Sequence, residues 1–271
     1  RTKTTRNSLI LLLTAAIWGM AFVSQSKGMD YMHPFTFNGV RSLIGAASIL
    51  VYILISRKIA GDKAAPLDWK LNVKAGLLCG IFLTIASTLQ QFGIKYTSVG
   101  KAGFITTLYI IFVPMFGIFL KKKVAPVVWA AAVMAAVGMY LLCMTESLRL
   151  GAGDIMVFLC AIAFAIQIMT VDHYAARIDG AVVSCIQFTV CGVVCCIGAL
   201  IWGQPTFGQL QEGLGALLYA GVLSCGVGYT LQIVGQKGLN PTVAALIMSL
   251  ESVIATISGW IAYKIGFLTT D

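Results

Sequence analysis

Long apolar stretches constrain this chain more than any other feature of its sequence. A transmembrane helix needs about 20 mostly apolar residues, and nine such stretches follow one another with short connections between them. We expect spans at about Ser8–Ser26, Pro34–Ser56, Val73–Ile94, Val99–Leu120, Val124–Met144, Asp154–His173, Ala181–Gly203, Gly213–Gln236 and Pro241–Ile265. Because no connection is long enough to form a soluble domain, the sequence predicts an all-α polytopic membrane protein.

Composition excludes the main soluble classes. Hydrophobic residues make up 59% of the 271 residues and charged residues only 11%, whereas soluble domains are about 45–50% apolar and about 25% charged. Such a chain has too little polar surface to cover a globule in water. A soluble enzyme, a disordered protein and a nucleic-acid-binding domain are therefore excluded.

The formal net charge of +9 predicts an orientation. Most Lys and Arg side chains lie between the apolar stretches, and cytoplasmic loops of membrane proteins are enriched in them. With the N-terminus in the cytoplasm, 13 basic residues fall on the cytoplasmic side and 5 on the other, and Arg41 lies inside the second span. We expect a bacterial cytoplasmic-membrane protein whose basic loops face anionic lipid, with no nucleic acid as partner.

The eight cysteines carry no metal or disulfide pattern. All lie inside apolar stretches, and none belongs to a CxxC motif or a Cys/His cluster. They are interpreted as packing residues, and we expect no metal and no cofactor.

An internal repeat is the most informative pattern. A shift of 142 residues places Leu89-Gln90 on Leu231-Gln232 and Lys95 on Lys237, and a further slip of four residues brings Trp18 onto Phe164. The unit is about five spans, so residues 1–148 and 149–271 form two units. Five is odd, so the second unit enters from the opposite side, as in the inverted repeats of secondary transporters.

The span count leaves a gap. Two units of five need ten spans, and this chain has nine. Either the fold has nine, or a tenth span is missing from this chain, which is our expectation.

Glu251 is the sharpest candidate functional residue because it lies in the middle of the ninth span. A charged residue there is costly and usually faces the protein interior or a water-filled cavity. We predict proton coupling or pairing with a substrate cation, and the 142-residue shift places Tyr109 opposite it. The structural alternative is a hydrogen bond to a neighbouring helix, through Lys101 or Arg41.

Other polar and aromatic residues inside the spans predict a cavity near the membrane midplane. Its predicted substrate-binding residues are Trp18, Gln90, Tyr109, Gln167, Tyr229, Gln232 and Glu251. Each glutamine serves equally well as a bond between helices, and Trp18 as packing. Arg41 is predicted to carry cavity charge or to extend its head group towards water. Pro114 should kink the fourth span, as part of a gate or as a bare kink.

Several short motifs, in a fixed order along the chain, are similar to those of a known family. They are Trp18-Gly19, Phe37-Asn38-Gly39-Val40-Arg41, Ala102-Gly103-Phe104-Ile105 before Pro114, Gly153-Asp154, and Asn240-Pro241-Thr242 before Leu250-Glu251-Ser252. With them the chain resembles the drug/metabolite transporter superfamily, and within it the EamA family of ten-span carriers. Ser252 stands where the family usually has Pro. The resemblance implies transport of a small solute such as an amino acid, another metabolite or an organic cation, with export favoured.

Two other classes compete with a secondary transporter that works by alternating access. Gly151-Ala152-Gly153-Asp154 has the form found in intramembrane aspartyl proteases, but that chemistry needs a second carboxylate, and no matching Asp lies in another span. A non-transporting receptor or scaffold is the second alternative. The expected partners are a small-molecule substrate and membrane lipid, and nothing in the sequence requires a homodimer.

Overall fold

The computed structural model describes residues 2–61, 66–119, 151–268 and some positions between 126 and 141. Every regular element within these residues is helical. The helices are α1 (Thr2–Gly28), α2 (Pro34–Ala60), α3 (Trp69–Ile94), α4 (Val99–Thr106), α5 (Tyr109–Phe119), α7 (Ala152–Tyr174), α8 (Gly180–Gly198), η2 (Ala199–Gly203), α9 (Phe207–Glu212), α10 (Leu214–Leu218), η3 (Tyr219–Gly228), α11 (Tyr229–Gln236), α12 (Pro241–Met248) and α13 (Glu251–Lys264). The η segments are π-helical turns that continue their neighbouring helices.

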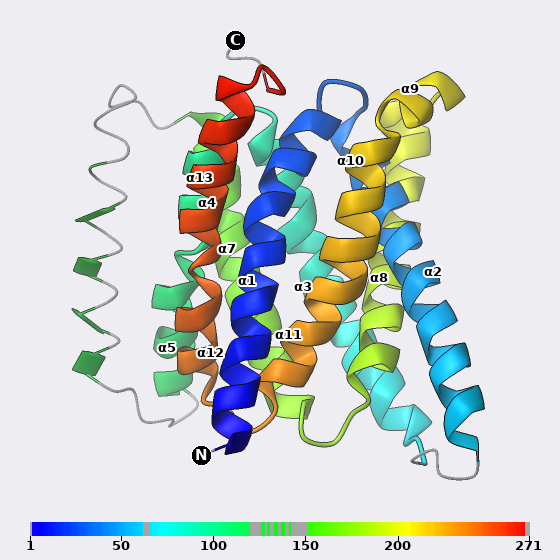
Figure 1. Ribbon diagram of the computed structural model, residues 1–271, viewed down its shortest axis with the longest axis vertical. Helices are drawn as coiled ribbons and strands as arrows, with labels where there is room; N and C mark the ends of the chain where they lie inside the picture. Colours follow the sequence, from blue (N-terminus) through cyan, green and yellow to red (C-terminus); the bar gives the residue numbers. More distant parts are fainter. Residues whose placement is uncertain are drawn as a thin grey trace.

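These helices form a bundle in which eight segments of the described chain are long and apolar enough to cross a membrane (Figure 1). They are Lys3–Gly28, Pro34–Ala60, Trp69–Ile94, Val99–Phe119, Ala152–Tyr174, Gly180–Gly203, Leu214–Gln236 and Pro241–Lys264. They correspond to all the predicted spans except the fifth. The predicted span Val124–Met144 lies largely outside the described residues.

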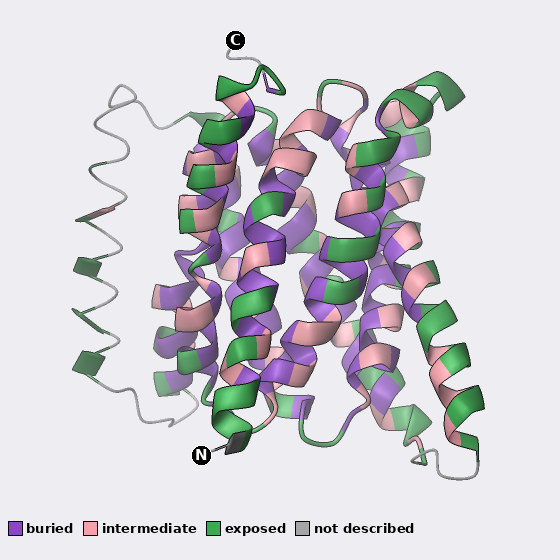
Figure 2. Ribbon diagram, viewed as in Figure 1, coloured by how far each residue is buried: buried purple, intermediate pink, exposed green. Residues whose placement is uncertain are grey.

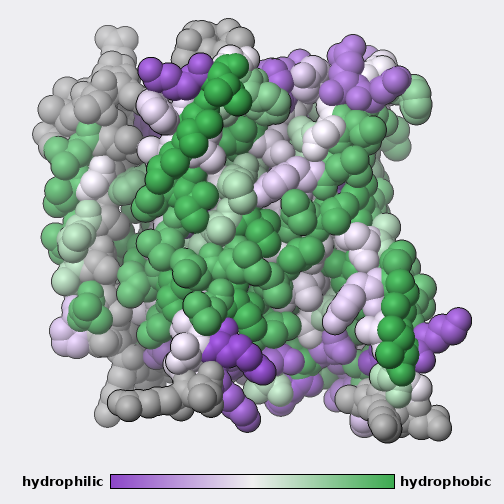
Figure 3. Space-filling view, viewed as in Figure 1, coloured by the Kyte–Doolittle hydropathy of each residue, from purple (hydrophilic) through white to green (hydrophobic). Residues whose placement is uncertain are grey.

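The surface of the bundle matches a membrane environment. Figure 3 shows a broad hydrophobic face between two hydrophilic rims. Large apolar side chains such as Leu54, Ile55 and Trp202 are exposed on the outside of the bundle. Figure 2 shows that buried residues gather on the inward sides of the helices. An apolar outside around a core that also buries polar side chains such as Gln91, Gln167 and Glu251 fits a solvent of lipid.

The helices pack as two interlocked sets of opposite orientation. α1 begins at the lower face in Figure 1, which we call the N-terminal face, whereas α7 begins at the opposite face, which we call the far face. α1 packs along η3, α11 and α13, and α7 packs along α3, α4 and α5. α2 packs along α8, and α4 along α13. The first helix of each unit therefore packs against the equivalent helices of the other unit, as a two-fold axis in the membrane plane requires.

Two helices are broken at equivalent positions. Thr107 and Leu108 separate α4 from α5, and Ser249 and Leu250, 142 residues later, separate α12 from α13. Tyr109 and Glu251 are thus the first residues of α5 and α13. Pro114 is expected to kink the fourth span, but the interruption lies six and seven residues before it, and Pro114 is inside α5.

A close approach of two backbones predicts a destabilising substitution. A Cβ added at Gly93 of α3 would collide with Val157 of α7 and lie 2.8 Å from the Gly153 carbonyl oxygen. Because backbone cannot move aside cheaply, we expect Gly93→Ala to reduce stability by about 1–3 kcal/mol. Thermal unfolding in detergent micelles measures this. Gly215→Ala, where nothing lies within 4 Å, is the matched control and should leave stability unchanged or slightly raised; equal midpoints for the two variants would contradict the prediction.

His33 predicts a pH effect at the start of α2. Its Nδ1 accepts a hydrogen bond from the Phe35 N–H at 3.3 Å, and burial, followed by the charge of Lys95, lowers the pKa of His33. The folded state thus favours the neutral ring, so its stability contribution is present at neutral pH and is lost as the pH falls below the ordinary value of about 6.5. We expect His33→Asn, which keeps the cap, to lose less thermal stability than wild type between pH 7.5 and 5.5; an equal loss would contradict this.

Candidate functional site

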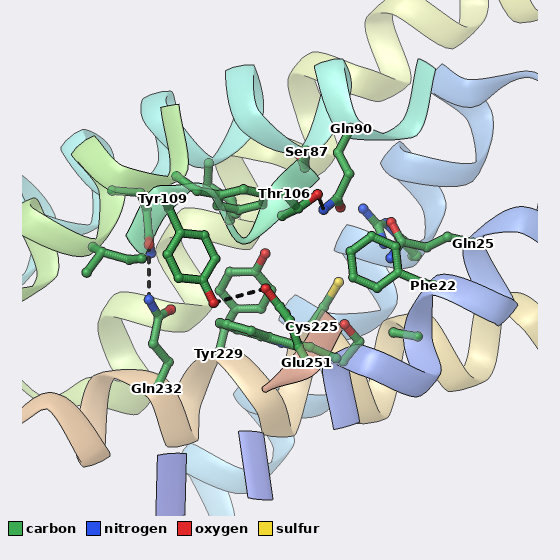
Figure 4. A pocket seen from close by; sticks show the side chains of 18 of the residues that line it. Phe22, Gln25, Ser87, Gln90, Thr106, Tyr109, Cys225, Tyr229, Gln232 and Glu251 are labelled. Atoms are coloured by element: carbon green, nitrogen blue, oxygen red, sulfur yellow. Dashed lines mark hydrogen bonds between the residues drawn. The ribbon is translucent and has the colours of Figure 1, made fainter. Parts of the chain in front are cut away.

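A cavity lies at the centre of the bundle, between helices of both units. It contains about 540 Å³ of space between atoms. Its lining is formed by Trp18, Ala21, Phe22, Gln25, Arg41, Leu83, Ser87, Gln90, Thr106, Tyr109, Phe164, Gln167, Ile168, Phe188, Ser224, Cys225, Tyr229, Gln232 and Glu251 (Figure 4). The centre of a water molecule can occupy only about 30 Å³ of that space, which is room for about two or three waters. A larger solute must therefore widen the cavity to enter it.

The structure brings almost all the predicted site residues together. The seven predicted substrate-binding residues and Arg41 all line this cavity. Pro114 does not line it, so only the helix break beside Tyr109 connects the fourth span with the site. The roles assigned to these residues remain predictions.

Glu251 and Tyr109 meet across the cavity. The Tyr109 hydroxyl donates a hydrogen bond to the Glu251 Oε1 at 3.0 Å, and both side chains are buried (Figure 4). Tyr109 and Glu251 each follow directly after a helix break, and the two breaks are equivalent positions of the repeat. A carboxylate at the first residue of a helix also lies near the positive end of the helix dipole. The pair thus presents a buried acid with a neutral donor as its partner.

The cations proposed as structural partners of Glu251 are engaged elsewhere. The Lys101 Nζ lies 2.7 Å from the Asp154 Oδ2. The Arg41 Nε donates to the Asn38 Oδ1 at 3.0 Å, and its guanidinium lies 5.5 Å from the centre of the Phe37 ring. Within the described part of the chain, neither Glu251 nor Arg41 has an ion-pair partner. The structural alternative through Lys101 or Arg41 is therefore replaced by the bond to Tyr109.

Glutamine side chains give the cavity a polar lining. The Gln232 Nε2 donates to the Gln167 Oε1 at 3.1 Å, and the Gln90 Nε2 donates to the Thr106 Oγ1 at 3.2 Å. The Gln167 Nε2 also donates to the Gln187 Oε1 at 3.4 Å. Gln90, Gln167 and Gln232 thus connect helices and line the cavity at once, whereas Gln187 lies outside the lining. The two interpretations of the sequence are therefore compatible, and the substrate-binding role remains a prediction.

Several buried polar atoms at the cavity have no hydrogen-bond partner in the described structure. They are the Trp18 Nε1, the Gln25 Oε1 and the Gln232 Oε1. An unpaired buried polar group is costly, by about 1–3 kcal/mol. A donor and two acceptors in this lining are therefore available to a bound molecule.

Aromatic rings form the apolar part of the wall. The Trp18 and Tyr229 rings are 4.5 Å apart, and the Phe188 and Tyr229 rings meet edge to face at 5.0 Å. Phe22 and Phe164 complete this wall. Sequence reasoning missed Phe22, Gln25, Phe164 and Phe188, although Phe164 aligns with Trp18 in the repeat. Gln25 lies seven residues after Trp18, hence on the same helical face.

The protease-like motif has a structural role here. Asp154 accepts hydrogen bonds from the Thr97 hydroxyl at 2.7 Å and the Gly151 N–H at 2.9 Å, in addition to its pairing with Lys101. It does not line the central cavity. Within the described structure its carboxylate is thus engaged by three donors.

Comparisons with known proteins agree with this architecture. The EamA-like transporter family model matches residues 6–144 and again residues 151–270. An "Uncharacterized transporter" of Archaeoglobus fulgidus is 30% identical over 171 residues, which are 61% of this chain and 48% of that protein. The "Uncharacterized transporter YwfM" of Bacillus subtilis is 27% identical over 93% of this chain and 84% of its own length.

One solved structure, a "Crystal structure of protein", supports the fold alone. It superposes with a TM-score of 0.73 over 98% of this chain and 90% of its own, at 17% sequence identity. Because the aligned region spans only about half of the archaeal relative, nothing about that whole protein is carried over. The two successive family matches confirm the two-repeat architecture, and with the eight apolar spans they identify an integral membrane protein. The chain belongs to the EamA-like transporter family.

Proposed function

We propose that this protein is a secondary transporter of a small zwitterionic solute of the amino-acid type. The observation that carries the proposal is a pair of opposite charges, Glu251 and Arg41, that line one buried cavity without pairing with each other or with another charge in the described structure. A buried charge without a partner is unfavourable. An ammonium beside Glu251 and a carboxylate beside Arg41 would compensate both.

The cavity walls support an organic solute. Trp18, Phe22, Phe164, Phe188 and Tyr229 offer apolar and aromatic surface, and Tyr229 and Trp18 also attract cations through their ring faces. Gln25 and Gln232 supply free acceptors for the ammonium group. Small-molecule sites commonly combine such walls with a few polar groups.

The proposed transport cycle is alternating access. One unit, residues 1–148, rocks against the other, residues 149–271, so that the closed cavity opens to one side and then to the other. In the empty state Glu251 would bind a proton, which a cationic group displaces, and this exchange would couple transport to protons. We propose that the N-terminal face is cytoplasmic because the basic residues favour it, and that export is the physiological direction.

A ligand-shift screen tests this function. Purified protein is heated with amino acids, the corresponding amino-acid amides, amines without the carboxyl group, sugars and nucleosides. A ligand that binds the folded state raises the apparent thermal stability. We expect the largest shift from an amino acid, a smaller one from its amide and none from sugars.

Uptake into proteoliposomes then separates transport from binding. Accumulation of the stabilising amino acid supports the transporter. A ligand that binds but never crosses the membrane would support a receptor instead. A shift produced only by neutral ligands would contradict the assignment of Glu251 and Arg41 to the site.

A further inference from the structure

A buried ion pair lies away from the cavity, at the far face. The Lys101 Nζ and the Asp154 Oδ2 are 2.7 Å apart, and their side chains are 8% and 4% exposed. The same carboxylate also accepts hydrogen bonds from Thr97 and Gly151. Three donors thus hold one buried carboxylate, which also completes the capping box at the start of α7.

This pair joins the two units at the far ends of their helices. Lys101 lies in the first turn of α4, and Thr97 lies in the turn before this helix. Asp154 lies in the first turn of α7. Beside them the backbones of Gly93 and Gly153 approach so closely that a Cβ on either would lie 2.8 Å from the other's carbonyl oxygen. The far ends of α3, α4 and α7 are therefore packed tightly together.

At the equivalent place on the N-terminal face, the described residues form no such pair. The repeat aligns Gly93 and Val157 with Gly235 and Leu11, which also touch each other. There the Asn7 Nδ2 donates a hydrogen bond to the Lys237 carbonyl oxygen at 2.7 Å. The positions equivalent to Lys101 and Asp154 hold Val243 and Ser8. The same junction is thus ionic on one face and neutral on the other.

The N-terminal face also carries a surface recess. A recess on the N-terminal face, between α2, α11 and the turn before α8, gives the centre of a water molecule about 590 Å³. It is lined by Tyr52, Ile53, Ser56, Arg57, Asn72, Asp179, Thr230 and Lys237 among others. The recess thus lies on the N-terminal face, beside the exposed Arg57–Asp179 ion pair, whereas the buried Lys101–Asp154 pair and the close approach of α3 and α7 lie on the far face.

We propose that the Lys101–Asp154 ion pair is a latch that holds the far face closed, so that the far side of the cavity opens only when this pair separates. A buried ion pair contributes little net stability, because desolvation offsets attraction, yet losing one partner is strongly unfavourable. When the far face opens, water enters and solvates both charges. Each charge is then paired in the closed state and hydrated in the open state, but it is neither paired nor hydrated in an intermediate state. The junction therefore has two stable states.

The latch rests on the alternating-access proposal, but its test needs no substrate. Cys225 lines the central cavity and is buried, so its reaction with a membrane-impermeant methanethiosulfonate reports access to the cavity. The reagent is applied to intact cells and to inverted membrane vesicles. Glu212→Cys, exposed at the far face, identifies the preparation in which that face is outside. Each variant is compared with its Cys225→Ser counterpart, so that only labelling of Cys225 is counted.

We expect Asp154→Asn and Lys101→Met to speed the labelling of Cys225 from the far face by roughly tenfold or more, as a population shift of that size requires. Thr97→Val, which removes one hydrogen bond, should have an intermediate effect, and Lys101→Arg should stay within about twofold of wild type. The matched control is Asp30→Asn, which removes an exposed 2.8 Å pair with Lys27 on the same face, between residues only three apart. It should leave the labelling rate unchanged.

Two results would overturn the latch. One is an unchanged rate in both Asp154→Asn and Thr97→Val, the second of which is mild enough to fold. The other is an equal acceleration by Asp30→Asn. If instead the labelling changes as expected while the wild-type protein transports none of the screened solutes, the proposed substrate class is wrong and the latch stands.

Discussion

Glu251→Gln is expected to weaken binding of a cationic or zwitterionic ligand by about 10- to 100-fold. Glutamine keeps the size of the side chain and an oxygen that accepts the bond from Tyr109, but it has no negative charge. Hydrogen bonds to charged groups contribute about 1.5–3 kcal/mol, and each 1.4 kcal/mol is a factor of ten in affinity. In the closed cavity, little water is present to replace the lost charge.

The measurement is the concentration dependence of the thermal shift, followed by the pH dependence of uptake in proteoliposomes. Glu212→Gln, an exposed carboxylate on α9, is the control and should change neither. Tyr109→Phe removes the hydroxyl that donates a hydrogen bond to the carboxylate and should reduce affinity less than Glu251→Gln does. If Glu251→Gln binds and transports normally with unchanged pH dependence, both the substrate-pairing and the proton-coupling roles of Glu251 are wrong.

The spans and the repeat could be predicted because hydrophobic length is a local property of the sequence. The eight spans that the structure describes begin and end within about five residues of the predicted bounds. The 142-residue shift aligned Tyr109 with Glu251, and the structure joins these same two residues by a hydrogen bond in the cavity. The pairing follows from the inverted symmetry, since equivalent positions near the axis face each other.

The position of the helix break was not predictable from Pro114. Proline removes a backbone donor and crowds the carbonyl four residues earlier, so the sequence indicates a weak point near Ile110 without fixing where the helix opens. The break lies instead at Thr107–Leu108, and the equivalent break at Ser249–Leu250 has no proline near it. Packing of the two units, a non-local property, therefore decides where the helices are interrupted.

The partners of buried charges were also beyond the sequence. Lys101 was a candidate partner of Glu251, whereas the structure places it against Asp154 at the far face. Asp154 and Glu251 both lie within spans. Only the tertiary arrangement shows that Glu251 lines the cavity and that Asp154 joins the units. Asp154 opens its span and Glu251 begins a half-helix, so depth in the membrane separates them in a way that residue type does not.

Arg41→Met is expected to abolish recognition of the substrate carboxylate and to leave recognition of the ammonium group intact. The Arg41 guanidinium is held by Asn38 and by the face of Phe37, and it lines the cavity without an anionic partner in the described residues. A guanidinium binds a carboxylate through two parallel hydrogen bonds, so we expect a loss of at least about 30-fold for an amino acid. An amide or amine analogue, which lacks the anionic group, should lose less than about threefold.

Arg41→Lys separates charge from geometry. Lysine keeps the positive charge but presents a point charge instead of a planar fork, so its affinity for the amino acid should lie between wild type and Arg41→Met. The measurement is a double-mutant-type cycle in which the protein changes at Arg41 and the ligand changes from acid to amide. A coupling energy near zero would show that Arg41 does not contact the carboxylate. The cavity would then be a site for organic cations, which Glu251 alone recognises.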